Sequence, residues 1–159
     1  MTLTAGTTIP DVTVHIKTEE GIEAIQTADY FANARVVMFV VPGAFTPTCS
    51  ARHLPGFIEH ADKLKAAGVD KIACLAVNDA HAMKAWGDAS GATGKIDMIA
   101  DSTALFAEAL GIAVNMGPVM GYRAGRCAVI ADNGVITKSF REEPGAFEVS
   151  SAEHLLSEL

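Results

Sequence analysis

The sequence predicts an α/β fold in which helices cover both faces of a central mixed β-sheet. Two apolar segments, residues 35–41 and 71–77, have no polar face, which is typical of central strands buried on both sides. Between them, residues 48–67 carry apolar side chains at helical spacing and are followed by Gly68, a residue suited to ending a helix. These three segments predict one strand-helix-strand unit with parallel strands.

The chain before this unit predicts an N-terminal β-hairpin. Polar and apolar side chains alternate over residues 12–17, and residues 22–25 are again apolar in part. Glu20-Gly21 supplies a turn between the two segments, as a hairpin requires.

After the unit, helices and strands continue to alternate. The pattern predicts a helix over residues 80–89, a short strand over 96–100 and a further helix over 103–110. Asp101 or Ser102 is expected to provide the N-cap of the last of these helices, because both side chains accept hydrogen bonds from exposed backbone N–H groups.

The C-terminal part predicts a second hairpin and a final helix. Asn133-Gly134 separates the strands expected over residues 127–131 and 135–140, and this pair tolerates the positive φ angles of a type I′ turn. Residues 151–159 are expected to be helical. The complete order of elements is that of a thioredoxin-like fold.

Composition limits the class of protein. The 159 residues are enough for a single domain over 1–159 with its own core. A net charge of −7 argues against nucleic-acid binding. The longest apolar run, 36–41, is far too short to span a membrane, and the N-terminus lacks a signal-peptide pattern. The three cysteines have the spacing of neither a disulfide framework nor a zinc or redox pair, so we expect a reducing compartment and a cytoplasmic location. The five histidines lack ligand spacing, so we expect no metal site.

Cys49 is the candidate nucleophile. It lies where a strand passes into a helix, the place at which open α/β sheets bind ligands. If Pro47 is the first helical residue, Thr46 is the N-cap and Cys49 is the third residue of the helix. Unpaired N–H groups and the helix dipole there favour a thiolate. An ordinary helix cap with a buried cysteine explains the same local features.

Pro42, Thr46 and Cys49 reproduce the PxxxTxxC signature of the peroxiredoxins. The longer stretch VPGAFTPTCSARHLPGF resembles the atypical peroxiredoxin-5 or plant type II subfamily, and the resemblance continues through residues 71–79 and 83–86 to the 132–135 turn. It implies a thioredoxin fold and an antioxidant peroxidase that reduces hydrogen peroxide and alkyl hydroperoxides without a cofactor.

The same resemblance assigns four site residues. Cys49 matches the peroxidatic cysteine, which would become a sulfenic acid. Thr46 matches the hydroxyl that binds peroxide, and Pro42 matches the residue that shields the pocket. Arg126 matches the guanidinium beside the sulfur; it lies 77 residues from Cys49, so only the fold could bring it there.

Other cysteine chemistries fit less well. A phosphatase loop needs Arg six residues after the nucleophile, where this chain has Pro55, and a thioredoxin-type pair needs a second cysteine where it has Arg52. A hydrolase needs a histidine base, but His53 is expected to be packed or solvated. The alternative that remains is a non-enzymatic interaction protein or holdase in which Cys49 is dispensable.

The resemblance also bears on recycling and assembly. Some relatives carry a resolving cysteine where residues 143–151 offer only serines, and Cys74 and Cys127 lie in apolar strands and are interpreted as core. An external thiol is therefore expected, glutathione or glutaredoxin first and thioredoxin second. Homodimers are implied, with Phe45 and the apolar loop 112–120 as interface candidates, although core packing would explain that loop equally well.

Overall fold

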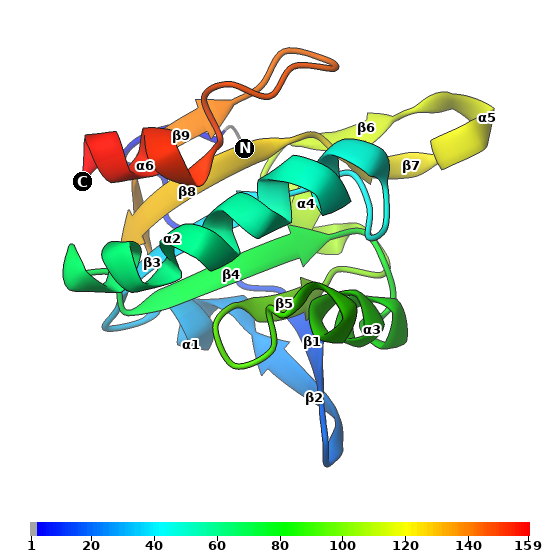
Figure 1. Ribbon diagram of the computed structural model, residues 1–159, viewed down its shortest axis with the longest axis horizontal. Helices are drawn as coiled ribbons and strands as arrows, with labels where there is room; N and C mark the ends of the chain where they lie inside the picture. The colour runs from blue at the N-terminus through cyan, green and yellow to red at the C-terminus, as the bar shows by residue number, and fades with distance from the viewer. Residues whose placement is uncertain (1–2) are drawn as a thin grey trace.

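A mixed sheet of seven strands forms the centre of the computed structural model, which describes residues 3–159 (Figure 1). Its strand order is β2-β1-β5-β4-β3-β8-β9. The strands are β1 (Thr13–Thr18), β2 (Gly21–Gln26), β3 (Arg35–Val40), β4 (Lys71–Ala76), β5 (Asp97–Ala100), β8 (Cys127–Asp132) and β9 (Val135–Arg141). β3 pairs with β4 in parallel, as predicted, and with β8 antiparallel.

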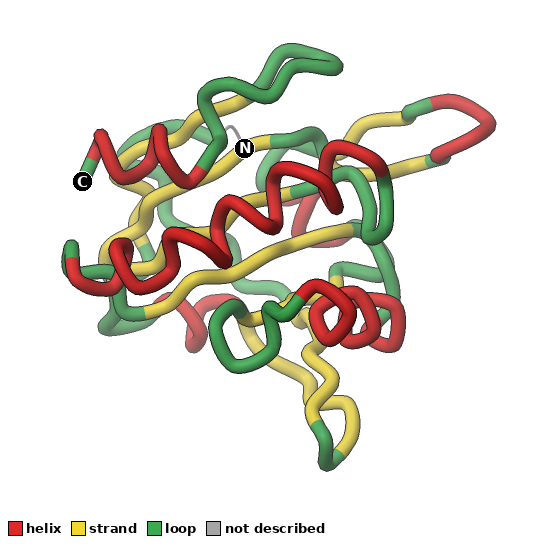
Figure 2. Tube along the Cα trace, in the orientation of Figure 1, coloured by secondary structure: helices red, strands yellow, loops and turns green. Residues whose placement is uncertain are grey.

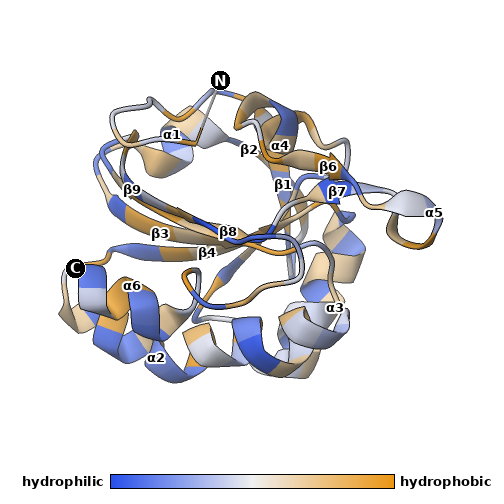
Figure 3. Cartoon of the chain, turned by 90° about the horizontal axis from the view of Figure 1, so that it is seen from above, coloured by the Kyte–Doolittle hydropathy of each residue, from blue (hydrophilic) through white to orange (hydrophobic). Residues whose placement is uncertain are grey.

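Helices cover both faces of this sheet, as the apolar strands predict. Figure 3 shows α2, α3 and α6 on one face and α1 and α4 on the other. The helices are α1 (Thr27–Phe31), α2 (Leu54–Ala66), α3 (Ala80–Ser90), α4 (Leu105–Ala109), α5 (Gly117–Met120) and α6 (Ala152–Glu158). Among residues 3–159, none of these helices combines the length and apolar character of a membrane span.

The sheet separates two hydrophobic cores because successive strand side chains point to opposite faces. Val37 and Phe39 of β3 belong to the core under α2, where Phe39 stacks on Phe57 with ring centroids 4.0 Å apart. Val36 and Met38 belong to the opposite core. Helices on both sides thus explain why β3 has no polar face.

The two predicted hairpins are confirmed. β1 and β2 pair antiparallel, with Thr18 opposite Gly21. In the second hairpin, Asn133 and Gly134 have φ angles of 47° and 77°, the positive values that a type I′ turn requires.

The helix expected over residues 103–110 is shorter than predicted. α4 begins only at Leu105, and its N-cap residue is Ala104, so the expected N-cap at Asp101 or Ser102 is wrong. The Asp101 carboxylate still accepts hydrogen bonds from the N–H groups of Phe106 and Ala107 in the first turn, at 3.1 and 2.8 Å.

Two parts of the fold were not predicted, a short helix and an arm. α1 is a single short helix after β2. The expected loop 112–120 instead forms part of an arm, in which β6 (Ala113–Asn115) and β7 (Tyr122–Ala124) pair antiparallel and α5 joins them. Figure 2 shows this arm extending beyond the sheet. Strands of three residues are too short for an alternating pattern to indicate them.

Candidate active site

The loop between β3 and the first helical turn is anchored to the neighbouring strand end. The N–H of Ala44 donates to the side-chain oxygen of Asn78, which follows β4, at 2.9 Å. Phe45 adopts a positive φ of 62°. For a bulky residue that conformation costs about 1–3 kcal/mol and is found mostly at functional sites.

The helix begins where the sequence predicts, with a different cap. The N–H of Ser50 donates to the carbonyl of Thr46 at 2.9 Å, so Pro47 starts the helix and Cys49 is its third residue. The Thr46 hydroxyl, however, donates to the Gly43 carbonyl at 2.7 Å and accepts no capping bond from the residues described. Thr46 therefore fixes the preceding loop, and its expected side-chain cap is wrong.

The first part of the predicted helix is π-helical over Cys49–His53, and α2 proper begins at Leu54. The N–H of Leu54 bonds to the carbonyl of Cys49. Pro55 explains the wider turn, because proline has no N–H to donate and its ring clashes with the carbonyl four residues earlier in a regular helix. Such single π-helical turns are frequent at functional sites.

The Cys49 side chain is fully buried and meets Arg126. Nη2 of Arg126 donates to Sγ of Cys49 at 3.1 Å. Arg126 stands between β7 and β8, and the pairing of β8 with β3 brings it to the end of β3. The guanidinium thus places a fixed positive charge directly beside the sulfur.

His53 holds the other side of the same guanidinium. Its Nδ1 lies 2.7 Å from Nη1 of Arg126, and its Nε2 lies 2.9 Å from the carbonyl of Ser150. A carbonyl only accepts, so Nε2 carries the hydrogen and Nδ1 accepts from Arg126. Burial, with Arg126 second, lowers the pKa of His53 to about 3. The ring is therefore neutral, and neither nitrogen is free to act as a base toward Cys49.

This arrangement confirms that His53 is packed and removes the histidine base that a hydrolase needs. Its contact with Arg126 was not predicted. The one signal in the sequence is its spacing of four residues from Cys49, which puts the two side chains on the same side of a helix.

Trp86 of α3 contacts the π-helical turn that contains Cys49. Its Nε1 donates to the Ser50 hydroxyl at 3.0 Å. The ring centroids of Trp86 and Phe45 are 6.4 Å apart. Phe45 is 58% exposed. Residues on both sides of Cys49 are thus in contact with one indole.

A pocket of about 660 Å³ lies over this arrangement. Pro42, Thr48 and Arg126 form its inner wall, and its outer walls come from the arm and from residues 141–146. Pro42 and Arg126 thus line one pocket, whereas Thr46 and the buried Cys49 are not among its lining residues.

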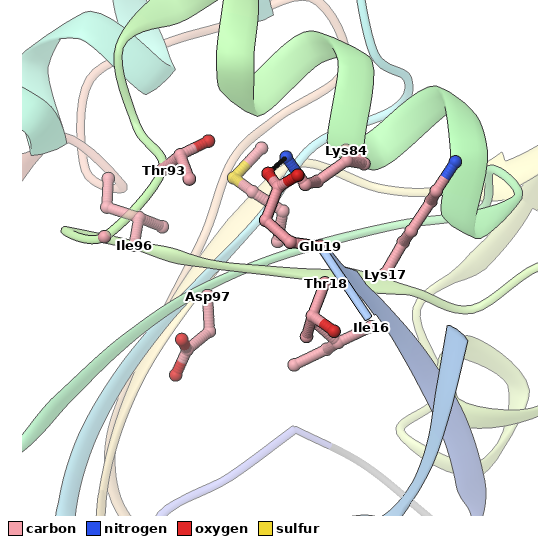
Figure 4. Close-up of a pocket in the computed structure, with 10 residues that line it drawn as sticks. Ile16, Lys17, Thr18, Glu19, Lys84, Thr93, Ile96 and Asp97 are labelled. Atoms are coloured by element: carbon pink, nitrogen blue, oxygen red, sulfur yellow. Dashed lines mark hydrogen bonds and ion pairs between the residues drawn. The ribbon is translucent and has the colours of Figure 1, made fainter. Parts of the chain in front are cut away.

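A second, smaller pocket of about 240 Å³ lies between β1 and the end of α3 (Figure 4). Its charged groups are already paired: Lys84 contacts Glu19 at 2.9 Å and Asp88 at 2.7 Å. No cysteine or histidine lines this pocket, so we assign it no chemistry.

The other two cysteines are buried in the sheet, as expected. Cys74 lies in β4 and shares a core with Cys49, and burial raises the pKa of its thiol well above the ordinary value. Cys127 begins β8 and belongs to the opposite core, where burial raises its pKa to about 12. Both are free thiols. Among residues 3–159 there is no cluster of three or more side chains able to hold a metal ion.

In this thioredoxin-like fold, Cys49 lies in the first helical turn after a central strand, and the Arg126 guanidinium donates to its sulfur. These features are those of a thiol-based oxidoreductase. Comparison with known proteins narrows the class. Residues 4–156 match the Redoxin family model. The chain is 42% identical to peroxiredoxin-2E-2, chloroplastic, of rice, over 99% of this chain and 73% of that protein.

Solved structures agree. The reduced Prx3 of Vibrio vulnificus in complex with hydrogen peroxide matches with a TM-score of 0.95 and 48% identity, over 98% of both chains. Peroxiredoxin 5 of Alvinella pompejana matches with a TM-score of 0.85 and 30% identity, over 97% of this chain and 96% of that one.

The chain belongs to the redoxin family and is a peroxiredoxin, similar to the plant type II proteins. It is therefore a thiol-dependent peroxidase, which reduces a peroxide with electrons from a thiol. The thioredoxin-like fold and the family resemblance are confirmed, and the non-enzymatic alternative is not favoured.

Proposed function

We propose that Cys49 is the peroxidatic residue. Its thiolate attacks one peroxide oxygen, the S–O bond forms as the O–O bond breaks, and the leaving oxygen takes a proton to depart as water or an alcohol. Cys49 is thereby oxidised to a sulfenic acid and the peroxide is reduced. The observation that carries this proposal is the 3.1 Å hydrogen bond from Arg126 to the sulfur.

Arg126, Thr46 and Pro42 complete the proposed site. Arg126 stabilises charge on the sulfur and on the developing oxygen. Cys49 lies in the first helical turn, where backbone N–H groups have no partner four residues earlier in the helix, and its N–H is proposed to donate to the same oxygen. Pro42 shields the pocket from bulk water. The pocket of about 660 Å³ is much larger than hydrogen peroxide and supports alkyl hydroperoxides as additional substrates.

Thr46 is proposed to accept a hydrogen bond from the peroxide. Its own hydrogen is directed to Gly43, so the hydroxyl oxygen has lone pairs left for a substrate O–H. Thr46→Ser is expected to keep most activity. Thr46→Val, which keeps the shape and removes the oxygen, is expected to lose about 10²-fold in the second-order rate constant with hydrogen peroxide. A near-normal rate in Thr46→Val would limit this residue to holding the loop.

Recycling is proposed to use an external thiol, with glutathione or glutaredoxin first and thioredoxin second. Cys74 lies in the middle of β4, opposite Phe39 on one side and Met98 on the other. The ladder fixes the backbone of Cys74 on both sides, so Cys74 cannot shift to meet Cys49 without breaking strand hydrogen bonds. Cys127 belongs to the core on the other side of the sheet.

Intact mass tests this proposal. One equivalent of peroxide should add one oxygen atom to the wild type, and excess peroxide should add a second as the sulfinic form appears. Glutathione should replace the oxygen with a mixed disulfide, and Cys74→Ala should behave identically. A stoichiometric Cys49–Cys74 bond, together with loss of turnover in Cys74→Ala with every reductant, would contradict it.

We also propose that residues 1–159 act as one domain, in the cytoplasm, as a homodimer. Free cysteines are typical of a reducing compartment. The arm and the neighbouring loop expose Val119, Tyr122 and Phe45, apolar side chains that a second copy could cover. Ile112, by contrast, is core. Sedimentation velocity of the wild type and of Val119→Asp tests this contact. We expect a dimer for the wild type and a monomer for the variant.

A further inference from the structure

One carboxylate oxygen organises the segment that follows β9. Oε2 of Glu142 accepts hydrogen bonds from the N–H of Glu148 at 2.7 Å, the N–H of Ser150 at 2.9 Å and the Ser150 hydroxyl at 2.7 Å. Burial alone would raise the pKa of Glu142, but these hydrogen bonds outweigh it and hold the pKa below its usual value. The group is thus an anion, and hydrogen bonds to an anion are about twice as strong as neutral ones.

The residue that this oxygen fixes is the one that orients His53. Ser150 is fully buried, and its carbonyl accepts from Nε2 of His53. That bond keeps the hydrogen on Nε2 and leaves Nδ1 as the acceptor for Arg126. The other terminal nitrogen of the same guanidinium, Nη2, donates to Cys49. An unbroken series of hydrogen bonds therefore joins Glu142 to the sulfur.

Glu142 also holds the main chain of Arg126, because its own N–H donates to the Arg126 carbonyl at 3.1 Å. One residue thus restrains both ends of the arginine, the backbone directly and the guanidinium through Ser150 and His53. Such restraint matters because an arginine side chain has about 2 kcal/mol of rotamer entropy to lose on being fixed.

We propose that Glu142 is a positioning residue of the peroxidase reaction, which holds the Arg126 guanidinium against the Cys49 sulfur through Ser150 and His53. This inference rests on the proposed roles of Cys49 and Arg126. It assigns to the segment after β9 a part in catalysis that is exerted through Arg126.

The test is the second-order rate constant for oxidation of Cys49 by hydrogen peroxide. Glu142→Ala is expected to lower it about tenfold or more, since displacing a catalytic group by about 1 Å costs up to about 10²-fold. Glu142→Gln keeps an acceptor oxygen and should lose clearly less. The matched control is Glu148→Ala, which removes an exposed carboxylate from the same segment, keeps the N–H that Glu142 binds, and should match the wild type.

A double-mutant cycle separates positioning from folding. In an Arg126→Met background, Glu142→Ala should cause no further loss, because residues that act as one unit are not additive. The inference would be overturned if the losses in the double variant were multiplicative, or if Glu142→Ala had a normal rate. It would also be overturned if Glu142→Ala and Glu148→Ala lost activity equally. A normal rate in Arg126→Met alone would instead overturn the proposed site, so the two failures are distinguishable.

Discussion

Cys49→Ser abolishes peroxide reduction if Cys49 is the nucleophile. A serine hydroxyl is not ionised at neutral pH and cannot form a sulfenic acid, so no later step can follow. The substitution changes one atom at a fully buried site, and Arg126 can still donate to the hydroxyl oxygen, so the fold should persist. Stopped-flow consumption of hydrogen peroxide with excess thiol measures the effect.

The other two cysteines supply matched controls. Cys74→Ala and Cys127→Ala should retain most of the activity, while each lowers the free energy of unfolding by about 1 kcal/mol through lost packing. Their raised pKa values make them poor nucleophiles. Substantial turnover in Cys49→Ser would remove the one-cysteine mechanism altogether.

Arg126→Met should lower the second-order rate constant with hydrogen peroxide by about 10²–10³-fold, the cost of removing one preorganised donor. Ionisation of the thiol cannot account for that much. A free cysteine with a pKa of ~8.5 is already about 3% thiolate at pH 7, so complete ionisation gains only about 30-fold. Most of the acceleration must therefore come from donors that act on the breaking O–O bond.

Arg52→Met is the control for this prediction. Arg52 stands in the same π-helical turn, but its guanidinium is stacked over Phe147, 4.7 Å from the ring centroid. Losing this cation should leave the rate within about twofold of the wild type, as expected for an exposed charge. Equal losses in the two variants would mean that general positive charge, and not the bond to the sulfur, drives the reaction.

The alternating strands and helices were predictable because the apolar pattern of each element is a local property of the sequence. β3, α2 and β4 were all identified in this way, and the turn at Asn133 followed from the φ angles that it must adopt. The arm at residues 113–124 was missed because its strands are too short for any period to appear.

Local patterns also located Cys49 in the first helical turn, but they could not assemble its surroundings. Arg126 reaches the sulfur only through the pairing of β8 with β3, and its role was inferred from family resemblance alone. The contacts of His53 depend on segments far apart in the sequence, with a separation of 73 residues from Arg126 and 97 residues from Ser150. Sequence spacing carries no information about such contacts, and the π-helical turn before Pro55 was not predicted either.

The bond between Trp86 and Ser50 gives the protein an intrinsic optical probe. Trp86 is the only tryptophan of the chain, and its indole N–H donates to Ser50, the residue that directly follows the proposed nucleophile Cys49. We expect an opening of the π-helical turn that admits a reductant to the sulfur to release that N–H and to expose the ring, which is now buried. The fluorescence of the unlabelled protein should therefore follow the oxidation and recovery of Cys49 in real time.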